Sequence, residues 1–240
     1  MLRRYLKETK RPIYSAALVL PFFLIYHGGI LFLRTTYING ADALIMRILS
    51  LLSVNTVFSS ALVLILTFVV WQVRTKASWK LHAPKLALMF LECFLFAVTL
   101  FFLLGWFSIH LATSLAPPEA SAPMFRGTHG RVVELVLYCG AGIYEELLFR
   151  GLLLGGLLLL LTNVLGMKKT LARVWAAVLA GLLFSLFHFV GPTGDSFTIQ
   201  SFLQRLFAGL YFSALFVGRG FGSAAASHAL YDILVGLARP

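Results

Sequence analysis

The chain has 240 residues, of which 60% are hydrophobic and only 12% are charged, and its mean hydropathy is +0.89. This composition excludes an ordinary soluble domain and favours a polytopic α-helical membrane protein, because apolar runs long enough to cross the hydrocarbon recur along the chain. The formal net charge of +11 does not indicate nucleic-acid binding, because Lys and Arg lie in short clusters between apolar runs, as in loops that face anionic lipid.

Apolar segments follow one another along the whole chain. Their expected bounds are 13–33, 43–73, 85–113, 132–164, 172–190, 199–218 and 222–238. The first is too long for a signal peptide and is read as a retained helix. The second and fourth are long enough to be kinked or split, so the pattern predicts an all-α bundle of seven to eight transmembrane helices. We expect one integral membrane domain, with N-terminal helices in 1–130 and a second group of helices in 131–240.

Basic residues mark alternate connections between the segments. They cluster at the N-terminus, in the second connection (74–85) and in the fourth (168–173). The positive-inside rule therefore predicts that these parts, including the N-terminus, face the cytoplasm. The connections at 35–42, 114–124 and 191–197 are poorer in Lys and Arg and rich in turn formers, which predicts the opposite side. We expect a multi-pass protein in the plasma membrane of a prokaryote.

Charged residues interrupt the fourth apolar segment in the stretch "EELLFR". Glu146 and Arg150 are four residues apart and share a helix face, which suits a buried ion pair. Glu145 lies about 100° around the helix axis from Glu146 and is not the natural partner of that arginine. An intramembrane carboxylate without a local partner indicates a functional site, whereas the Glu146–Arg150 pair could equally serve packing alone.

Two later segments carry histidines. His188 ends the segment with "FSLFH", where an interfacial anchor is the simpler interpretation for a histidine taken alone. In "SHALYD", His228 and Asp232 are four residues apart, so the carboxylate can orient the imidazole or both groups can face one cavity. Counting helical rise from the expected segment ends brings Glu145, His188 and His228 within about one or two turns of a common depth. A shared site in the C-terminal half is therefore feasible.

These motifs together resemble the CPBP family of intramembrane proteases, which includes type II CAAX prenyl endopeptidases and bacteriocin-processing or self-immunity proteins. "EELLFR" fits Glu-Glu-x-x-x-Arg, "FSLFH" fits Phe-x-x-x-His and "HALYD" fits His-x-x-x-Asn/Asp, in the family's order and over about the last 110 residues. The resemblance implies peptide-bond hydrolysis, in which Glu145 and His188 activate a water. It places His228 and Asp232 where the family has its oxyanion-stabilising groups, and it makes Phe184, Glu146 and Arg150 supporting residues.

Asp232 departs from the Asn that often fills its position in that family. An ionised Asp cannot donate a hydrogen bond to a developing oxyanion. Asp232 is therefore expected either to be protonated or to orient His228. A zinc-dependent version would use Glu145, His188 and His228 as ligands, with an open position for water. Because no helix carries a His-Glu-x-x-His motif, a metal-free glutamate mechanism without a cofactor is favoured.

Alternative functions remain open from the sequence. A non-catalytic immunity factor, a scaffold or a proton-coupled transporter would keep the same polar cluster, although a transporter more often shows matching broken segments in two halves. Within the enzyme class, the resemblance implies membrane lipid and a membrane-anchored protein or peptide as partners, with cleavage near the substrate's C-terminus. That substrate is a prenylated peptide or, as the second choice, an exported protein with a C-terminal sorting anchor.

Overall fold

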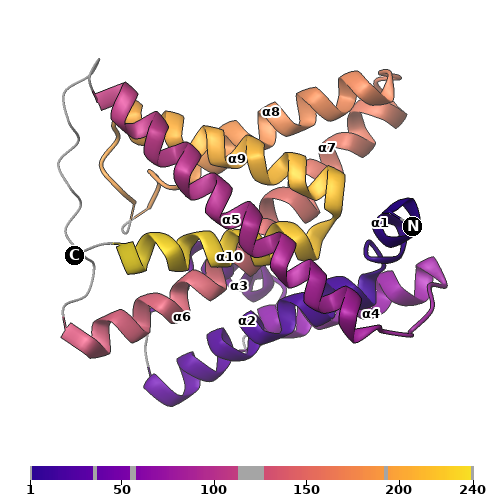
Figure 1. The fold of residues 1–240 in the computed structure, drawn as a ribbon, viewed down its shortest axis with the longest axis horizontal. Helices are drawn as coiled ribbons and strands as arrows, with labels where there is room; N and C mark the ends of the chain where they lie inside the picture. Colours follow the sequence, from indigo (N-terminus) through magenta and orange to yellow (C-terminus); the bar gives the residue numbers. More distant parts are fainter. Residues whose placement is uncertain (1, 35–36, 55–57, 113–126, 192–193, 239–240) are drawn as a thin grey trace.

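The computed structural model describes residues 2–34, 37–54, 58–112, 127–191 and 194–238, and all regular secondary structure within these ranges is helical (Figure 1). The predicted all-α class is therefore confirmed. The elements are α1 (Leu2–Glu8), α2 (Pro12–Leu33), α3 (Gly40–Leu51), α4 (Ser59–Thr75), α5 (Ala83–Ala112), α6 (Gly127–Glu146), η1 (Leu147–Leu154), α7 (Gly155–Leu159), η2 (Leu160–Val164), α8 (Lys169–Phe187), α9 (Ile199–Arg219) and α10 (Phe221–Ala238).

Five helices in the described part of the chain are long and apolar enough to cross a membrane. They cover Pro12–Leu33, Ala83–His110, Gly130–Val164, Lys169–Phe187 and Ile199–Arg219. The chain is thus an integral membrane protein. α10 is not among the five, because His228 and Asp232 interrupt its apolar sequence.

The second and fourth predicted segments, both long enough to be split, behave differently. The second, 43–73, breaks into α3 and the apolar but shorter α4, with Ser53 in a left-handed conformation (φ 63°) after the end of α3. Neither α3 nor α4 is among the five long apolar helices of the described residues, so the split does not add a transmembrane helix to reach the predicted seven to eight. The fourth is continuous from Gly130 to Val164, but it winds as a π-helix over Leu147–Leu154 and Leu160–Val164. The predicted connection at 114–124 lies outside the described residues.

α10 lies in the centre of the bundle, where it contacts α6, α5, α2 and α9 (Figure 1). Its first half, from Phe221 to Ala229, is entirely buried. A Cβ atom at Gly142 of α6 would lie 2.5 Å from the backbone nitrogen of Ala229, so these two helices meet backbone to backbone. Small residues permit such close approach. The contact brings the end of α6, which carries Glu145 and Glu146, against α10.

The helices α8 and α9 also pack closely through glycine. A Cβ atom at Gly209 of α9 would lie 2.9 Å from the Cα of Gly181 in α8. The two helices run antiparallel, so the end of α8 lies near the start of α9 (Figure 1). This arrangement places His188, at the C-terminal end of α8, beside the first turns of α9.

The basic N-terminal segment and the second connection gather at one end of the bundle. Arg11 donates hydrogen bonds to the backbone oxygens of Ser78 (3.1 Å) and Lys80 (3.0 Å), and Lys85 pairs with Glu8. Hydrogen bonds from Lys85 and Arg4 lower the pKa of the Glu8 carboxyl to about 2. The N-terminal segment and the second connection, which the charge pattern puts on the same side of the membrane, thus lie at the same end of the fold.

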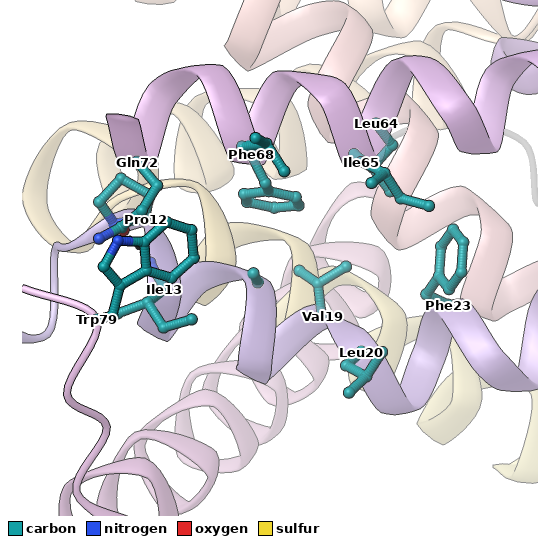
Figure 2. Close-up of a pocket in the computed structure, with 12 residues that line it drawn as sticks. Pro12, Ile13, Val19, Leu20, Phe23, Leu64, Ile65, Phe68, Gln72 and Trp79 are labelled. Atoms are coloured by element: carbon teal, nitrogen blue, oxygen red, sulfur yellow. Dashed lines mark hydrogen bonds between the residues drawn. The ribbon is translucent and has the colours of Figure 1, made fainter. Parts of the chain in front are cut away.

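An apolar groove runs between α2 and α4 near this end (Figure 2). Figure 2 shows Val19, Leu20 and Phe23 of α2 opposite Ile65 and Phe68 of α4, with Trp79 at one end of the groove. Its volume is about 250 Å³. None of its lining residues is titratable or nucleophilic, so the groove has no groups for acid–base or nucleophilic chemistry.

Candidate active site

A second cavity, of about 320 Å³, is lined by the four predicted catalytic residues and by Phe184. It lies toward the end of the bundle away from the basic N-terminal segment, between the ends of α6, α8 and α10 and the start of α9. The lining residues are Leu104, Glu145, Phe184, His188, Ser201, Gln204, Arg205, Ala208, Phe212, His228, Tyr231, Asp232 and Val235. Three sequence motifs on three different helices therefore converge on one cavity.

The two oxygens of Glu145 have different surroundings. Oε1 accepts a hydrogen bond of 2.9 Å from Nδ2 of Asn39. Oε2 is buried and has no hydrogen-bond partner among the described residues. It lies 3.6 Å from Nε2 of His188 and 3.9 Å from Nε2 of His228. One oxygen is thus held by an amide, while the other faces both imidazole rings.

Glu146 and Arg150 form the predicted ion pair in the interior of the bundle. Nη1 of Arg150 lies 2.7 Å from Oε1 of Glu146, and both side chains are 0% exposed. Nη2 of Arg150 donates to the backbone oxygen of Gly209 (3.0 Å), which ties the pair to α9. The π-helical winding begins directly after Glu146, so the pair spans the junction of α6 and η1. Such π-helical turns are frequent at functional sites.

Glu146 also contacts His228, a relation that the sequence did not indicate. Nδ1 of His228 lies 2.9 Å from Oε1 of Glu146. Because an ionised carboxylate only accepts hydrogen bonds, this contact assigns a proton to Nδ1 and turns Nε2 toward the cavity. The ring also stacks on Phe212 of α9, with centroids 4.4 Å apart and an interplanar angle of 17°. The ion pair therefore positions a second site residue as well as neutralising buried charge.

Asp232 lies on the cavity side of His228. Its Oδ2 is 3.5 Å from Nε2 of His228, which is longer than a good hydrogen bond. The two residues face one cavity, which was one of the two predicted arrangements, and Glu146 supplies the closer carboxylate contact to the ring.

Phe184 connects the arginine to both histidines. The guanidinium of Arg150 lies over its ring, 4.4 Å from the centroid, and the rings of His188 and His228 contact it at 4.9 Å and 5.9 Å. The backbone oxygen of Phe184 lies 2.9 Å from Nδ1 of His188. A carbonyl oxygen only accepts hydrogen bonds, so Nδ1 of His188 carries the proton and Nε2 is directed at Glu145.

The predicted zinc ligands Glu145, His188 and His228 are neighbours. Their types suit zinc, and the Glu146 contact to His228 resembles the second-shell hydrogen bonds of zinc sites. Among the described residues, however, no group of three His, Cys, Asp or Glu side chains is arranged to hold a metal ion.

Several residues around the site were not predicted, and two of them, Asn39 and Phe212, contact predicted site residues directly. Asn39 precedes α3 as its N-cap in the stretch "INGAD", where only its role as a turn or helix-capping residue is visible from the sequence. Phe212 is one of 22 phenylalanines, so its residue type carries no signal. Both act through contacts with residues far away in the chain, which sequence spacing does not reveal.

Comparison with protein families gives one match. The model of the family described as type II CAAX prenyl endopeptidase Rce1-like matches residues 130–234. No curated protein and no solved structure matches the chain. The matched range contains Glu145, Glu146, Arg150, His188, His228 and Asp232, whereas Asn39 lies outside it. Residues 130–234 are therefore similar to the Rce1-like type II CAAX prenyl endopeptidases, a family of membrane peptidases, in agreement with the resemblance of the sequence motifs to the CPBP intramembrane proteases.

Proposed function

We propose that the protein is an intramembrane endopeptidase that cleaves near the C-terminus of a membrane-attached protein or peptide, with a water activated by Glu145 and His188. The observation that carries this proposal is the buried Oε2 of Glu145, which has no hydrogen-bond partner in the part of the chain that the structure describes and faces the Nε2 atoms of both histidines at a cavity. A carboxylate in such a position serves as a general base.

The reaction is a metal-free hydrolysis. Oε2 of Glu145 takes one proton from the water, and Nε2 of His188 accepts a hydrogen bond from it. The water oxygen forms a bond to the carbonyl carbon of the substrate, and the carbonyl oxygen becomes an oxyanion. His228, protonated on both nitrogens, donates a hydrogen bond to this oxyanion through Nε2. Asp232 lies beside the His228 ring. The C–N bond then breaks, and Glu145 returns its proton to the leaving nitrogen.

The family match favours a prenylated C-terminal peptide as the substrate. The cavity agrees with a peptide that is held at the membrane, because it combines the polar groups of the site with apolar walls from Leu104, Ala208 and Val235. By the positive-inside rule, the basic end of the bundle faces the cytoplasm, which puts the cavity toward the opposite side of the membrane.

The test is hydrolysis of a peptide by the purified protein in lipid nanodiscs. A peptide that ends in a prenylated cysteine followed by three residues is compared with the same peptide without the lipid, and products are identified by mass spectrometry. Glu145→Gln keeps the side-chain shape but removes the base, so turnover should fall about a hundredfold or more while thermal stability is preserved. Glu134→Gln, on the same helix but outside the cavity, is the matched control and should keep full activity.

The same experiment separates the alternatives. Full activity of well-folded Glu145→Gln protein would reject the general-base assignment. Loss of activity on treatment with a chelator, with recovery on adding zinc, would replace the metal-free reaction by the zinc-dependent one. A parent protein that cleaves neither peptide, nor a peptide with a C-terminal transmembrane anchor, would favour the non-catalytic alternatives.

A further inference from the structure

The side chain of Asn39 joins the N-terminal helices to the proposed catalytic carboxylate. Its Oδ1 accepts hydrogen bonds from the backbone nitrogens of Ala41 (2.9 Å) and Asp42 (3.4 Å), so it caps the start of α3. These two donors determine which end of the amide is oxygen. The nitrogen Nδ2 therefore points the other way, to Oε1 of Glu145 at 2.9 Å. Asn39 is thus a hydrogen-bond donor to this carboxylate.

Asn39 is itself held by a second buried contact. Its backbone nitrogen donates to the hydroxyl of Tyr26 (3.1 Å), and that hydroxyl donates to Oδ2 of Asp42 (2.7 Å). Tyr26 is 0% and Asp42 2% exposed. A Cβ atom at Gly140 of α6 would lie 2.3 Å from the ring of Tyr26, so α2 packs closely on the helix that carries Glu145. The cap of α3 is therefore locked to both α2 and α6.

We propose that Asn39 is a positioning residue for Glu145, and that residues of the N-terminal helices complete a site whose reacting groups all lie in the matched domain. Asn39 holds Oε1, which leaves Oε2, on the side of the two imidazole rings, to take the proton from water. It also prevents rotation of the carboxylate away from the Nε2 atoms of His188 and His228. This role deepens the proposed function and rests on it for its effect on turnover.

A serine at position 39 separates the two roles of this residue. Serine is also a good N-cap, so Asn39→Ser keeps the start of α3, but its side chain is too short to reach Glu145. The expected result is a melting temperature close to that of the parent, a KM within about twofold and a kcat lower by about tenfold, the size of one lost hydrogen bond to a charged group. Asn163→Ser, at an exposed asparagine away from the cavity, is the matched control and should change neither quantity.

Infrared difference spectroscopy tests the contact without relying on peptidase activity. The spectrum of Asn39→Ser minus the parent should show shifted carboxylate stretching bands, because Oε1 of Glu145 has lost its donor. The same exchange made in a Glu145→Gln background should lack these bands. If the bands shift in Asn39→Ser while the parent hydrolyses no peptide, the proposed function would be refuted, but the contact between Asn39 and Glu145 would still be supported.

Three results would overturn the positioning role. The first is an unchanged kcat when Asn39→Ser is made in a protein whose parent is an active peptidase. The second is a carboxylate difference band that persists in the Glu145→Gln background, because the band would then belong to another carboxylate. The third is a kcat loss in Asn39→Ser that only follows a lower melting temperature, because Asn39 would then act as a helix cap alone.

Discussion

Two Glu–Arg pairs of the same spacing occupy opposite surroundings in this molecule. In α1, Nε of Arg4 lies 2.8 Å from Oε1 of Glu8, and the side chains are 84% and 22% exposed. At the junction of α6 and η1, Arg150 and Glu146 are 2.7 Å apart and 0% exposed. Both pairs join residues four apart, with the order of the two residue types reversed. The buried pair, however, has lost its hydration, so each charge depends on the other and on the contacts to Gly209 and His228.

The largest effect is expected from breaking the buried pair. Arg150→Ala leaves Glu146 charged without its partner and removes the cation above Phe184, so the free energy of unfolding should fall by about 3 to 5 kcal/mol. Turnover should fall with it, because Glu146 positions His228. Thermal or denaturant unfolding in detergent, measured beside the peptidase assay, gives both quantities.

Arg4→Ala is the matched control for this comparison, since it removes the arginine of an exposed pair with the same spacing. Its cost in stability should stay below about 1 kcal/mol, with turnover unchanged. An Arg150→Ala protein as stable as Arg4→Ala, with only its turnover reduced, would show that the buried arginine acts in the reaction rather than in the fold.

A smaller effect is expected at a third pair of the same spacing, His228 and Asp232. If Asp232 is a neutral acid that donates to the oxyanion, Asp232→Asn keeps a donor and needs no proton, so activity should persist and extend to higher pH. We expect this outcome, because the distance of 3.5 Å to Nε2 of His228 does not indicate a strong charge-assisted hydrogen bond.

The measurement is the pH–rate profile of Asp232→Asn beside the parent on one peptide. A profile that is lower at every pH, in a folded protein, would mean instead that an ionised Asp232 orients His228, which leaves that ring as the oxyanion donor.

The smallest effect is expected from the partly exposed cluster of Glu8, Arg4 and Lys85. The pKa of Glu8 is lowered from 4.5 to about 2 by Lys85 and Arg4, so its contribution to stability is present above pH 4.5 and is lost as the pH falls toward 2. Glu8→Gln should therefore melt slightly below the parent at pH 7, and the difference should shrink as the pH falls through this window. A difference in melting temperature that is constant from pH 7 to pH 2.5 would contradict the assigned charge effect.

The sequence alone predicted the parts of the molecule that depend on local periodicity. Apolar runs located the helices, because a chain segment in lipid must satisfy its backbone hydrogen bonds within itself. The four-residue spacing of Glu146 and Arg150 predicted their ion pair, and the position of Glu145 on another part of the helix surface predicted that it would be left for a different partner. The site motifs were readable for the same reason, since each lies within one helix.

Only the tertiary structure decided how these helices meet. The contact of Glu146 with His228 joins residues 82 apart in the chain, and that of Asn39 with Glu145 joins residues 106 apart. Both depend on close packing at single glycines, Gly142 against Ala229 and Gly140 against Tyr26. Helix periodicity determines which side chains share a face, but the distance between two faces is determined by the shape of everything packed between them. For that reason Glu145, the proposed base, could be predicted from the sequence, whereas Asn39, whose amide holds it, could not.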